Sequence, residues 1–417
     1  MKSRPMRAVV GVFLVILSLP ISAAEPSPEV FLPSPENKDA YAPCAAYGKE
    51  MFLVAWQSGR LAEGDLRKGV KGQSDIVGVR VSRDGKPLDA KPIVISTAKN
   101  MRQSPRVAFG GGIFLVVWHD LRNGKDWDLF AARVSPEGKV LDPDGIAICT
   151  EPRNQALPRV VWDGTAFLVV WQDYRSTERY EVYGARVSPE GKVLDAGGNL
   201  LESAKDRHRY APAAASLGGG KSLMLWNGDI RIGTGTIAGG VVVTDGKPVS
   251  KVVFDSDARK HGPGFQWVPM SLTAGPTGYL VAWTTDNTLG RDPGPADTNA
   301  SILDADGKRK ISLLLAGKAH RTRDPDAAWD GSGFVAVWHE AIRESKDTSL
   351  ADAVFGSRIS PEGKVSDVQQ LSGTFQNPAA MACAASDGKG LTLVTYEKHP
   401  NKGDVPIKIG VRVLTAK

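Results

Sequence analysis

The stretch that decides the fold lies in the middle of the chain and reads Phe167-Leu168-Val169-Val170-Trp171, followed after a polar loop by Glu181-Val182-Tyr183-Gly184-Ala185-Arg186-Val187. The first segment is wholly apolar, as expected of a strand covered on both faces, and the second alternates as a half-buried strand does. A short strand ending at Trp162 and an Asp163-Gly164 turn come before them, and a short strand over 199–202 follows. One repeat therefore predicts four antiparallel strands, which is the composition of a propeller blade.

The same pattern recurs through the chain. The aromatic residue that ends the second strand of each copy stands at Trp56, Trp118, Trp171, Trp226, Trp283, Trp338 and Tyr396. Successive spacings are 62, 53, 55, 57, 55 and 58 residues. Repeats of this size made only of strands cannot bury a core alone, so they must pack against their neighbours. The sequence predicts an all-β fold, a seven-bladed β-propeller with four-stranded blades.

The last copy has no fourth strand of its own, because the chain stops shortly after a third strand over 409–414. A segment near the other end, about residues 28–34, resembles the fourth strands of other copies; it reads Glu29-Val30-Phe31-Leu32-Pro33-Ser34, and one such fourth strand reads Ile93-Val94-Ile95-Ser96-Thr97. Pairing this segment with the last copy would close the ring and leave no open edge. We therefore expect the last blade to be closed by the N-terminal strand.

Residues 1–24 have the features of a signal peptide. Lys2, Arg4 and Arg7 give a basic start, residues 8–21 are an apolar run, and Ser22-Ala23-Ala24 offers a cleavage site. We expect residues 25–417 to form a single propeller that is secreted or periplasmic, monomeric and not inserted into a membrane. Removing the signal lowers the formal net charge from +6 to +3, which argues against nucleic acid as a partner.

The repeats also resemble a known group of proteins. Trp118-His119-Asp120-Leu121-Arg122, followed by Phe130-Ala131-Ala132-Arg133-Val134-Ser135-Pro136-Glu137-Gly138-Lys139-Val140-Leu141-Asp142, is similar to the VVWxDxR and YGxRVSPxGKxLD patterns of secreted bacterial β-propeller repeat proteins. The resemblance covers the mature chain, closely in the second, third and sixth copies and loosely in the fourth, fifth and seventh. It implies a propeller fold and export, and it implies no particular activity.

Residues that recur in nearly every copy are interpreted as parts of the blade. We expect cross-strand ion pairs within blades, Asp120 with Arg133 and Asp173 with Arg186. Cys44 and Cys383 fall on the first strands of blades that become neighbours when the ring closes; a bridge between them and two buried free thiols are the alternatives. Nothing in the spacing of Cys, His, Asp and Glu indicates a metal or other cofactor.

Function is expected where the copies differ. The loops after the second and fourth strands are long and irregular, whereas the other turns are short and uniform, and variable loops on a rigid scaffold commonly carry binding. All six histidines fall in this variable set of loops. Three loops that lead into first strands, near the channel, supply the candidate ligand-binding residues His208, Arg209, Tyr210, His261, Trp267, His320, Arg321 and Arg323. Because the guanidinium fork matches carboxylate and sulfate, we predict a basic, aromatic mouth that binds an anionic glycan or another acidic ligand.

Three functions are compatible with this pattern. The favoured one is an exported binding or scaffold protein without catalytic residues, with an acidic polysaccharide as its partner. A second is a polysaccharide-active enzyme, either a lyase or a glycoside hydrolase, that uses the same face. The hydrolase needs two carboxylates across the scissile bond, yet Asp39, Asp257 and Asp324 come from three different blades. The third is a structural module that contacts an extracellular protein.

Overall fold

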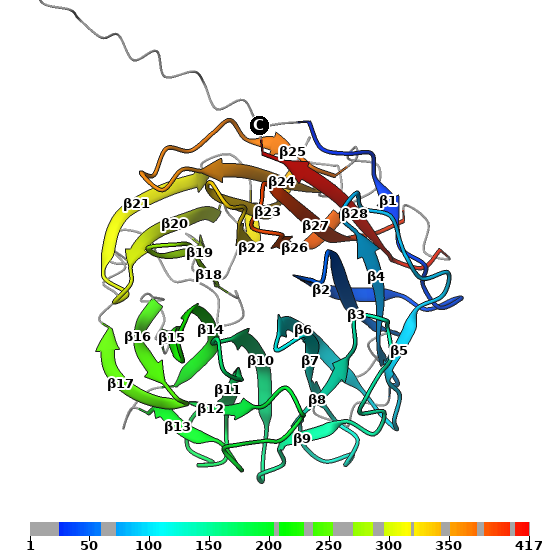
Figure 1. Ribbon diagram of the computed structural model, residues 1–417, viewed down its shortest axis with the longest axis vertical. Helices are drawn as coiled ribbons and strands as arrows, with labels where there is room; N and C mark the ends of the chain where they lie inside the picture. The colour runs from blue at the N-terminus through cyan, green and yellow to red at the C-terminus, as the bar shows by residue number, and fades with distance from the viewer. Residues whose placement is uncertain are drawn as a thin grey trace, which may run out of the picture.

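The computed structural model describes residues 25–59, 72–203, 208–228, 237–252, 270–286, 296–317, 321–342, 351–372, 379–400 and 405–416. These residues contain twenty-eight strands in seven four-stranded antiparallel blades around a central axis (Figure 1). Among them there is no helix that is long and apolar enough to cross a membrane. The predicted seven-bladed propeller is confirmed. The expected signal peptide, residues 1–24, lies outside the described residues.

Each blade runs outward from its innermost strand at the axis to its outermost strand at the rim (Figure 1). Blade 1 consists of β2 (Ala40–Gly48), β3 (Met51–Ser58), β4 (Asp75–Ser82) and β5 (Ile93–Ser96). Blade 2 consists of β6 (Arg102–Gly110), β7 (Ile113–Asp120), β8 (Asp128–Val134) and β9 (Ile146–Cys149). Blade 3 consists of β10 (Gln155–Trp162), β11 (Phe167–Asp173), β12 (Glu181–Val187) and β13 (Asn199–Glu202).

The second half of the ring repeats this order. Blade 4 consists of β14 (Arg209–Gly218), β15 (Lys221–Gly228), β16 (Ile237–Thr244) and β17 (Lys247–Val252). Blade 5 consists of β18 (Ser271–Ala274), β19 (Gly278–Asp286), β20 (Ala296–Asp304) and β21 (Arg309–Ala316). Blade 6 consists of β22 (Arg321–Trp329), β23 (Phe334–Ile342), β24 (Ala351–Ile359) and β25 (Gln369–Gln370). Blade 7 consists of β26 (Ala379–Ser386), β27 (Leu391–Lys398), β28 (Lys408–Thr415) and, from the other end of the chain, β1 (Val30–Phe31).

The ring is closed by the N-terminal strand, as expected. In β1, Val30 is opposite Val411 and Phe31 is opposite Gly410 of β28, and the two strands lie side by side in Figure 1. The backbone N–H of Leu32 then donates to the carbonyl of Ile409 at 3.0 Å, and the Leu32 side chain is buried. This pairing covers the outer edge of β28, which would otherwise present unpaired backbone groups.

The hydrophobic core lies between blades. Trp56, Trp118, Trp171 and Trp338 are fully buried, as their position at the ends of the second strands predicts. Trp171 belongs to a cluster that also contains Leu115 of blade 2, so it packs across the boundary between blades 2 and 3. Each blade therefore depends on its neighbour for burial of its largest side chains.

The VVWxDxR pattern is a clamp around the buried tryptophan. In blade 2, Trp118 Nε1 donates to Asp120 at 2.8 Å, and the guanidinium of Arg122 binds the same carboxylate at 2.7 Å. That guanidinium also lies over the ring of Phe130, 3.7 Å from its centroid. Blade 3 has the same arrangement, in which Trp171 and Arg175 share the carboxylate of Asp173. The clamp satisfies the indole N–H, which would be costly to bury unpaired.

The expected ion pairs of Asp120 with Arg133 and of Asp173 with Arg186 are wrong. Arg133 binds Asp142 at 2.8 Å, and Arg186 binds Asp195 at 2.9 Å, each nine residues further along the chain. Both arginines also reach the turn of the following blade. Arg133 donates a hydrogen bond to the carbonyl of Pro189, and Arg186 lies beside Gly246. The interpretation of the repeated charges as parts of the scaffold is retained, with different partners.

Candidate functional site: the central channel

The innermost strands share a β-bulge that shapes the channel. It occurs in β2, β6, β10, β14, β22 and β26. One residue in each bulge has a left-handed backbone with φ between 43° and 53°: Ala42, Ser104, Leu157, Ala211, Asp324 and Met381. Such a φ is unfavourable for residues with a side chain, and it persists only where the surrounding structure determines it. A bulge also re-aims the side chain that follows it.

The residue two places after the left-handed one lines the channel. In each blade this residue is paired with the residue that precedes the repeated aromatic, for example Arg159 with Val170 and Asp326 with Val337. In β18, Ser271 has the same register opposite Ala282. We call these seven equivalent positions the channel ring: Cys44, Arg106, Arg159, Ala213, Ser271, Asp326 and Cys383.

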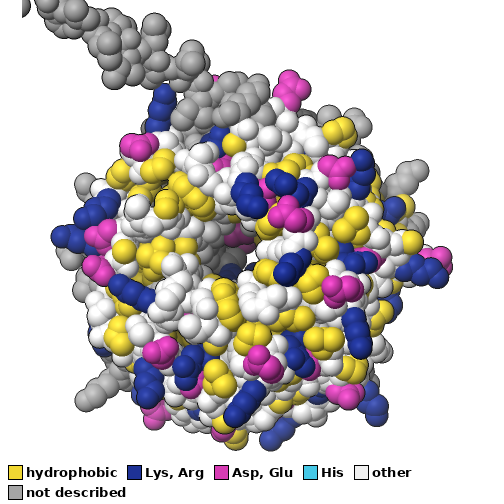
Figure 2. Space-filling view, in the orientation of Figure 1, with side chains coloured by type: hydrophobic (Ala, Val, Ile, Leu, Met, Phe, Trp, Pro, Cys, Tyr) yellow, Lys and Arg dark blue, Asp and Glu magenta, His cyan; other side chains and the backbone are white. Residues whose placement is uncertain are grey.

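All seven residues of the channel ring line one cavity of about 170 Å³. The hollow is visible at the centre of the face shown in Figure 2. Its volume is smaller than the roughly 300–1,000 Å³ of pockets that enclose drug-sized ligands. The cavity therefore suits a small ligand, or the end group of a larger one.

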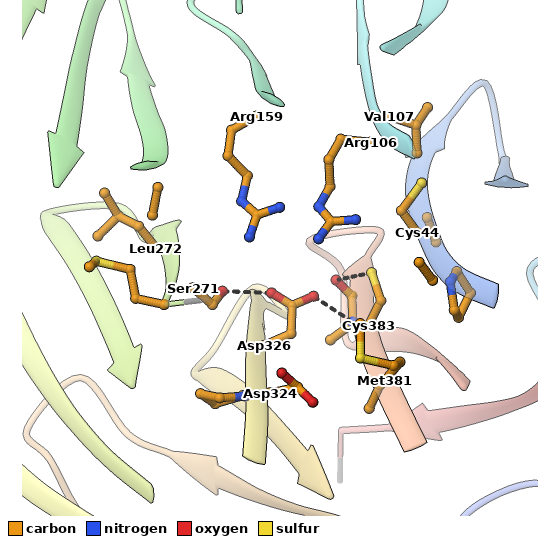
Figure 3. Close-up of a pocket in the computed structure, with 18 of the residues that line it drawn as sticks. Cys44, Arg106, Val107, Arg159, Ser271, Leu272, Asp324, Asp326, Met381 and Cys383 are labelled. Carbon is orange, nitrogen blue, oxygen red and sulfur yellow. Dashed lines mark hydrogen bonds between the residues drawn. The ribbon is translucent and has the colours of Figure 1, made fainter. Parts of the chain in front are cut away.

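Two arginines from adjacent blades point side by side into this cavity (Figure 3). Arg106 donates to the backbone oxygen of Pro105 at 2.7 Å. Arg159 makes no hydrogen bond or ion pair with the described residues. Burial, together with the charge of Arg106, lowers the pKa of Arg159 to about 9. Two neighbouring guanidinium groups in an enclosed channel repel each other, and an anion placed between them would remove that repulsion.

Two carboxylates of blade 6 line the same cavity. Asp326 accepts a hydrogen bond from Ser271 Oγ at 2.6 Å and from the backbone N–H of Ala384 at 3.0 Å, which ties blades 5, 6 and 7 together (Figure 3). Asp324 is 3.3 Å from Nδ1 of the buried His339. Burial raises the pKa of Asp324, although His339 and Arg323 oppose that rise. Asp326 is thus fixed in position, and Asp324 retains its proton to higher pH than an exposed aspartate.

The channel ring also holds two of the three cysteines, and all three are free. Cys44 donates to the carbonyl of Ala55 at 3.4 Å. Burial raises the pKa of Cys44 to about 12 and that of Cys383 well above its usual value. Both side chains therefore stay protonated at neutral pH, where a thiol is a poor nucleophile and a poor metal ligand. Of the two alternatives for this pair, the structure contains the free thiols.

Three of the predicted ligand-binding residues lie together at the junction of blades 3 and 4. The ring of His208 stacks on Tyr210 with centroids 5.1 Å apart, and His208 Nδ1 accepts a hydrogen bond from the backbone of Tyr180 at 3.0 Å. Arg209 is 3.8 Å from the carboxylate of Glu202. These contacts join the blade 3 loop to the start of blade 4, so all three residues already have protein partners.

The other five predicted residues are placed only in part. His261, Trp267 and His320 lie outside the described residues. Arg321 begins β22, and its side chain is also outside them. Arg323 is half-buried in β22, immediately before Asp324. The convergence of all eight at one mouth stays a prediction.

The channel residues Arg106, Arg159 and Asp326 were not among the candidates from sequence. The repeats contain a pattern from which these residues could have been predicted, because the residue after the bulge proline differs between copies that otherwise agree. The five tripeptides are Ala42-Pro43-Cys44, Ser104-Pro105-Arg106, Leu157-Pro158-Arg159, Ala211-Pro212-Ala213 and Asp324-Pro325-Asp326. A charged residue at a position that is elsewhere small is a departure that the blade itself does not require.

Comparison with known proteins agrees with the fold. No family model and no curated protein matches the chain. The chain is similar to a crystal structure of a protein of unknown function from Dyadobacter fermentans, at 11% identity over 94% of this chain and 99% of that one, with a TM-score of 0.51. It is also similar to a polysaccharide lyase of family PL25, an ulvan lyase, at 10% identity over 92% of this chain and 95% of that one, with a TM-score of 0.54. At such low identity these similarities establish the propeller fold alone.

Proposed function

We propose that this chain is an exported β-propeller that binds an acidic ligand in its central channel, with Arg106 and Arg159 as the groups that contact the anion. The observation that supports the proposal most directly is Arg159, a half-buried guanidinium that lies in the channel beside a second guanidinium and forms no hydrogen bond or ion pair with the described residues. A partly desolvated charge without an ion-pair partner costs free energy in the empty protein. A carboxylate or sulfate would offset that cost through charge-assisted hydrogen bonds.

The expected mouth then lies where the innermost strands begin. A ligand that enters from this side passes the start of these strands before it reaches Arg106 and Arg159. Along β22, Arg323 lies between the start of the strand and Asp324. In this arrangement the basic and aromatic residues expected at the mouth attract an acidic glycan, and the channel holds its charged end group. The ulvan lyase likeness adds nothing to this step, because it reflects fold only.

A second candidate function is catalysis on an acidic glycan. The observation that favours it is the contact of Asp324 with His339, in the same cavity as the two guanidinium groups. A carboxyl whose pKa is raised by burial is suited to general-acid chemistry, and the guanidinium groups would offset the substrate's charge. A glycoside hydrolase needs two carboxylates on opposite sides of the scissile bond, whereas the two carboxylates that line this cavity, Asp324 and Asp326, share one strand.

Binding is tested by isothermal titration of the mature chain with acidic oligosaccharides and with small carboxylates and sulfates. Arg106→Met/Arg159→Met should abolish binding, and added salt should weaken it in the wild type. The matched control is Arg133→Met, which removes an arginine from the outer Asp142 pair and should leave binding intact. Equal binding by the double channel variant and the wild type would overturn the proposal. Product analysis of any glycan that binds separates the binder from the enzyme.

A further inference from the structure

The charges of the channel ring are divided between two sides, and this division bears on the chemistry of the ligand. Arg106 and Arg159 occupy neighbouring positions in blades 2 and 3, whereas Asp326 belongs to blade 6. The positions that separate them around the ring are uncharged on both sides: Ala213 and Ser271 in blades 4 and 5, and Cys383 and Cys44 in blades 7 and 1. Figure 3 shows the arginines and Asp326 facing each other across the cavity.

These opposite charges attract each other across the cavity without forming an ion pair. Neither Arg106, Arg159 nor Asp326 forms an ion pair with any described residue, although all three line the same cavity. Asp326 is held in place by Ser271 and by the backbone of Ala384, so its carboxylate is not free to swing toward the arginines. These two hydrogen bonds and the contact with the Cys383 thiol leave at least one of the roughly four lone pairs of the carboxylate for a ligand. The second carboxylate, Asp324, precedes it on the same strand and adds negative charge to that side.

An anion that carries only negative charge is a poor match for such a cavity. It would gain from Arg106 and Arg159, but Asp324 and Asp326 would repel its far end. A ligand with a positive group at that far end would turn the repulsion into attraction. Electrostatic complementarity of this kind discriminates between ligands more strongly than it raises affinity.

We propose, building on the proposed function, that the channel ligand is a small zwitterion or the zwitterionic end of a larger molecule. Its carboxylate or sulfate binds Arg106 and Arg159, and its ammonium group binds Asp326 and Asp324. Amino acids with the two charges at opposite ends, and sugars that carry both an acidic and an amino group, have this chemistry. A simple uronate carries only the negative group, and a simple amine carries only the positive group.

The test is isothermal titration of the mature chain at pH 8 with a series of ω-amino acids from glycine to 6-aminohexanoate, each compared with the carboxylate and the amine of equal length. At the length that fits the channel, the amino acid should bind at least about tenfold more tightly than the carboxylate or the amine of equal length, a difference of about 1.4 kcal/mol in binding free energy. Asp324→Asn should weaken amino-acid binding about tenfold and strengthen carboxylate binding, because it removes the repulsive charge. Asparagine tolerates the left-handed backbone at this position, so the variant is expected to fold. Asp142→Asn, which alters a carboxylate of the outer ion pair, is the matched control and should change neither.

The outcomes separate this inference from the proposal on which it depends. If carboxylates bind through Arg106 and Arg159 as tightly as amino acids at every length, the zwitterion is refuted and the acidic ligand stands. If Asp324→Asn affects the two ligand series equally, the division of charges plays no part in selection and the inference is again refuted. If no carboxylate, amino acid or acidic oligosaccharide binds, both proposals are refuted.

Discussion

Replacing Arg159 by methionine should make the protein more stable while it removes ligand binding. Arg159 is half-buried beside Arg106 and forms no hydrogen bond or ion pair with the described residues, so its charge opposes folding. Methionine is close to it in length and can fill the same space without a charge or an unmet hydrogen bond. A scaffold residue would behave in the opposite way, because its removal would break contacts that the fold needs.

The size of the gain follows from the lowered pKa of Arg159. The lowering of the pKa of Arg159 by burial to about 9 corresponds to about 5 kcal/mol against the charged form, at 1.36 kcal/mol per pKa unit. Water in the cavity reduces this figure and the arginine stem loses its packing, so we expect a net gain of about 1–2 kcal/mol. Above about pH 9 the folded chain loses this proton while the unfolded chain keeps it, so the penalty that Arg159 imposes on stability is relieved only as the pH rises beyond about 9. At pH 7 both states carry the charge, and the whole penalty is present.

The assay is thermal unfolding of the mature chain and of Arg159→Met at pH 7. For a chain of this size the gain corresponds to a rise in Tm of about 1–3 °C. Arg133→Met is the comparison, because Arg133 lies in a partly buried ion pair with Asp142, and its loss should lower the Tm by a similar amount. A Tm for Arg159→Met below that of the wild type would show that Arg159 supports the fold, and the assignment of the channel as a binding site would lose its main support.

Three further measurements test the scaffold. Trp171→Ala should cost about 3–5 kcal/mol in chemical unfolding, since a fully buried indole leaves a cavity between blades 2 and 3; a cost below 1 kcal/mol would contradict that packing. A chain that lacks residues 25–35 should melt at lower temperature than one that starts at Glu25, because β28 loses its partner; equal melting temperatures would show that β1 is dispensable. Burial and the neighbouring Asp126 raise the pKa of Asp128 to about 6, so the contribution of Asp128 to stability should fall as the pH rises from about 4 to 6. The advantage of Asp128→Asn over the wild type should therefore grow by up to about 2 kcal/mol between pH 4 and 7.5, and a constant difference would be inconsistent with the raised pKa.

The blade architecture could be predicted from the sequence because its determinants are local and repeated. An apolar strand that ends in an aromatic residue is fixed by its own composition, and seven copies at similar spacing leave few arrangements other than a ring. Ring closure was predictable as well, because the missing fourth strand of the last copy and the spare strand around Val30 complement each other. The Trp171 slot was placed correctly for the same reason.

The ion pairs were predicted wrongly because strand register was not known. Asp120 is opposite Asp128, whereas Arg133 is opposite Leu115, five residues back along β7. At about 3.3 Å per residue these two side chains are on the order of 16 Å apart, at opposite ends of the blade. Asp120 is therefore satisfied by Arg122 in its own loop.

The channel site was missed for a different physical reason. Strict alternation of side chains tells which residues of a strand face one side, and a bulge interrupts that alternation. Arg159 follows such a bulge at Leu157, so the period-two pattern gives no reliable direction for its side chain. The mouth residues His208 and Tyr210 were conspicuous by type, yet they pack against each other and against Tyr180. The residue types led to a predicted site in the loops, whereas the geometry of the structure favours a site in the channel.

The recurring bulge presents different side chains to the channel from the same backbone conformation. In six blades the backbone enters and leaves the bulge in the same way, whether the residue that follows is cysteine, arginine, alanine or aspartate. The residues that determine the chemistry of the channel are thus different from the repeated residues that determine the blade fold. The seven positions of the channel ring could therefore be varied together in a combinatorial library. Such a library would change the arrangement of charges around the axis and keep every strand, turn and buried tryptophan of the scaffold.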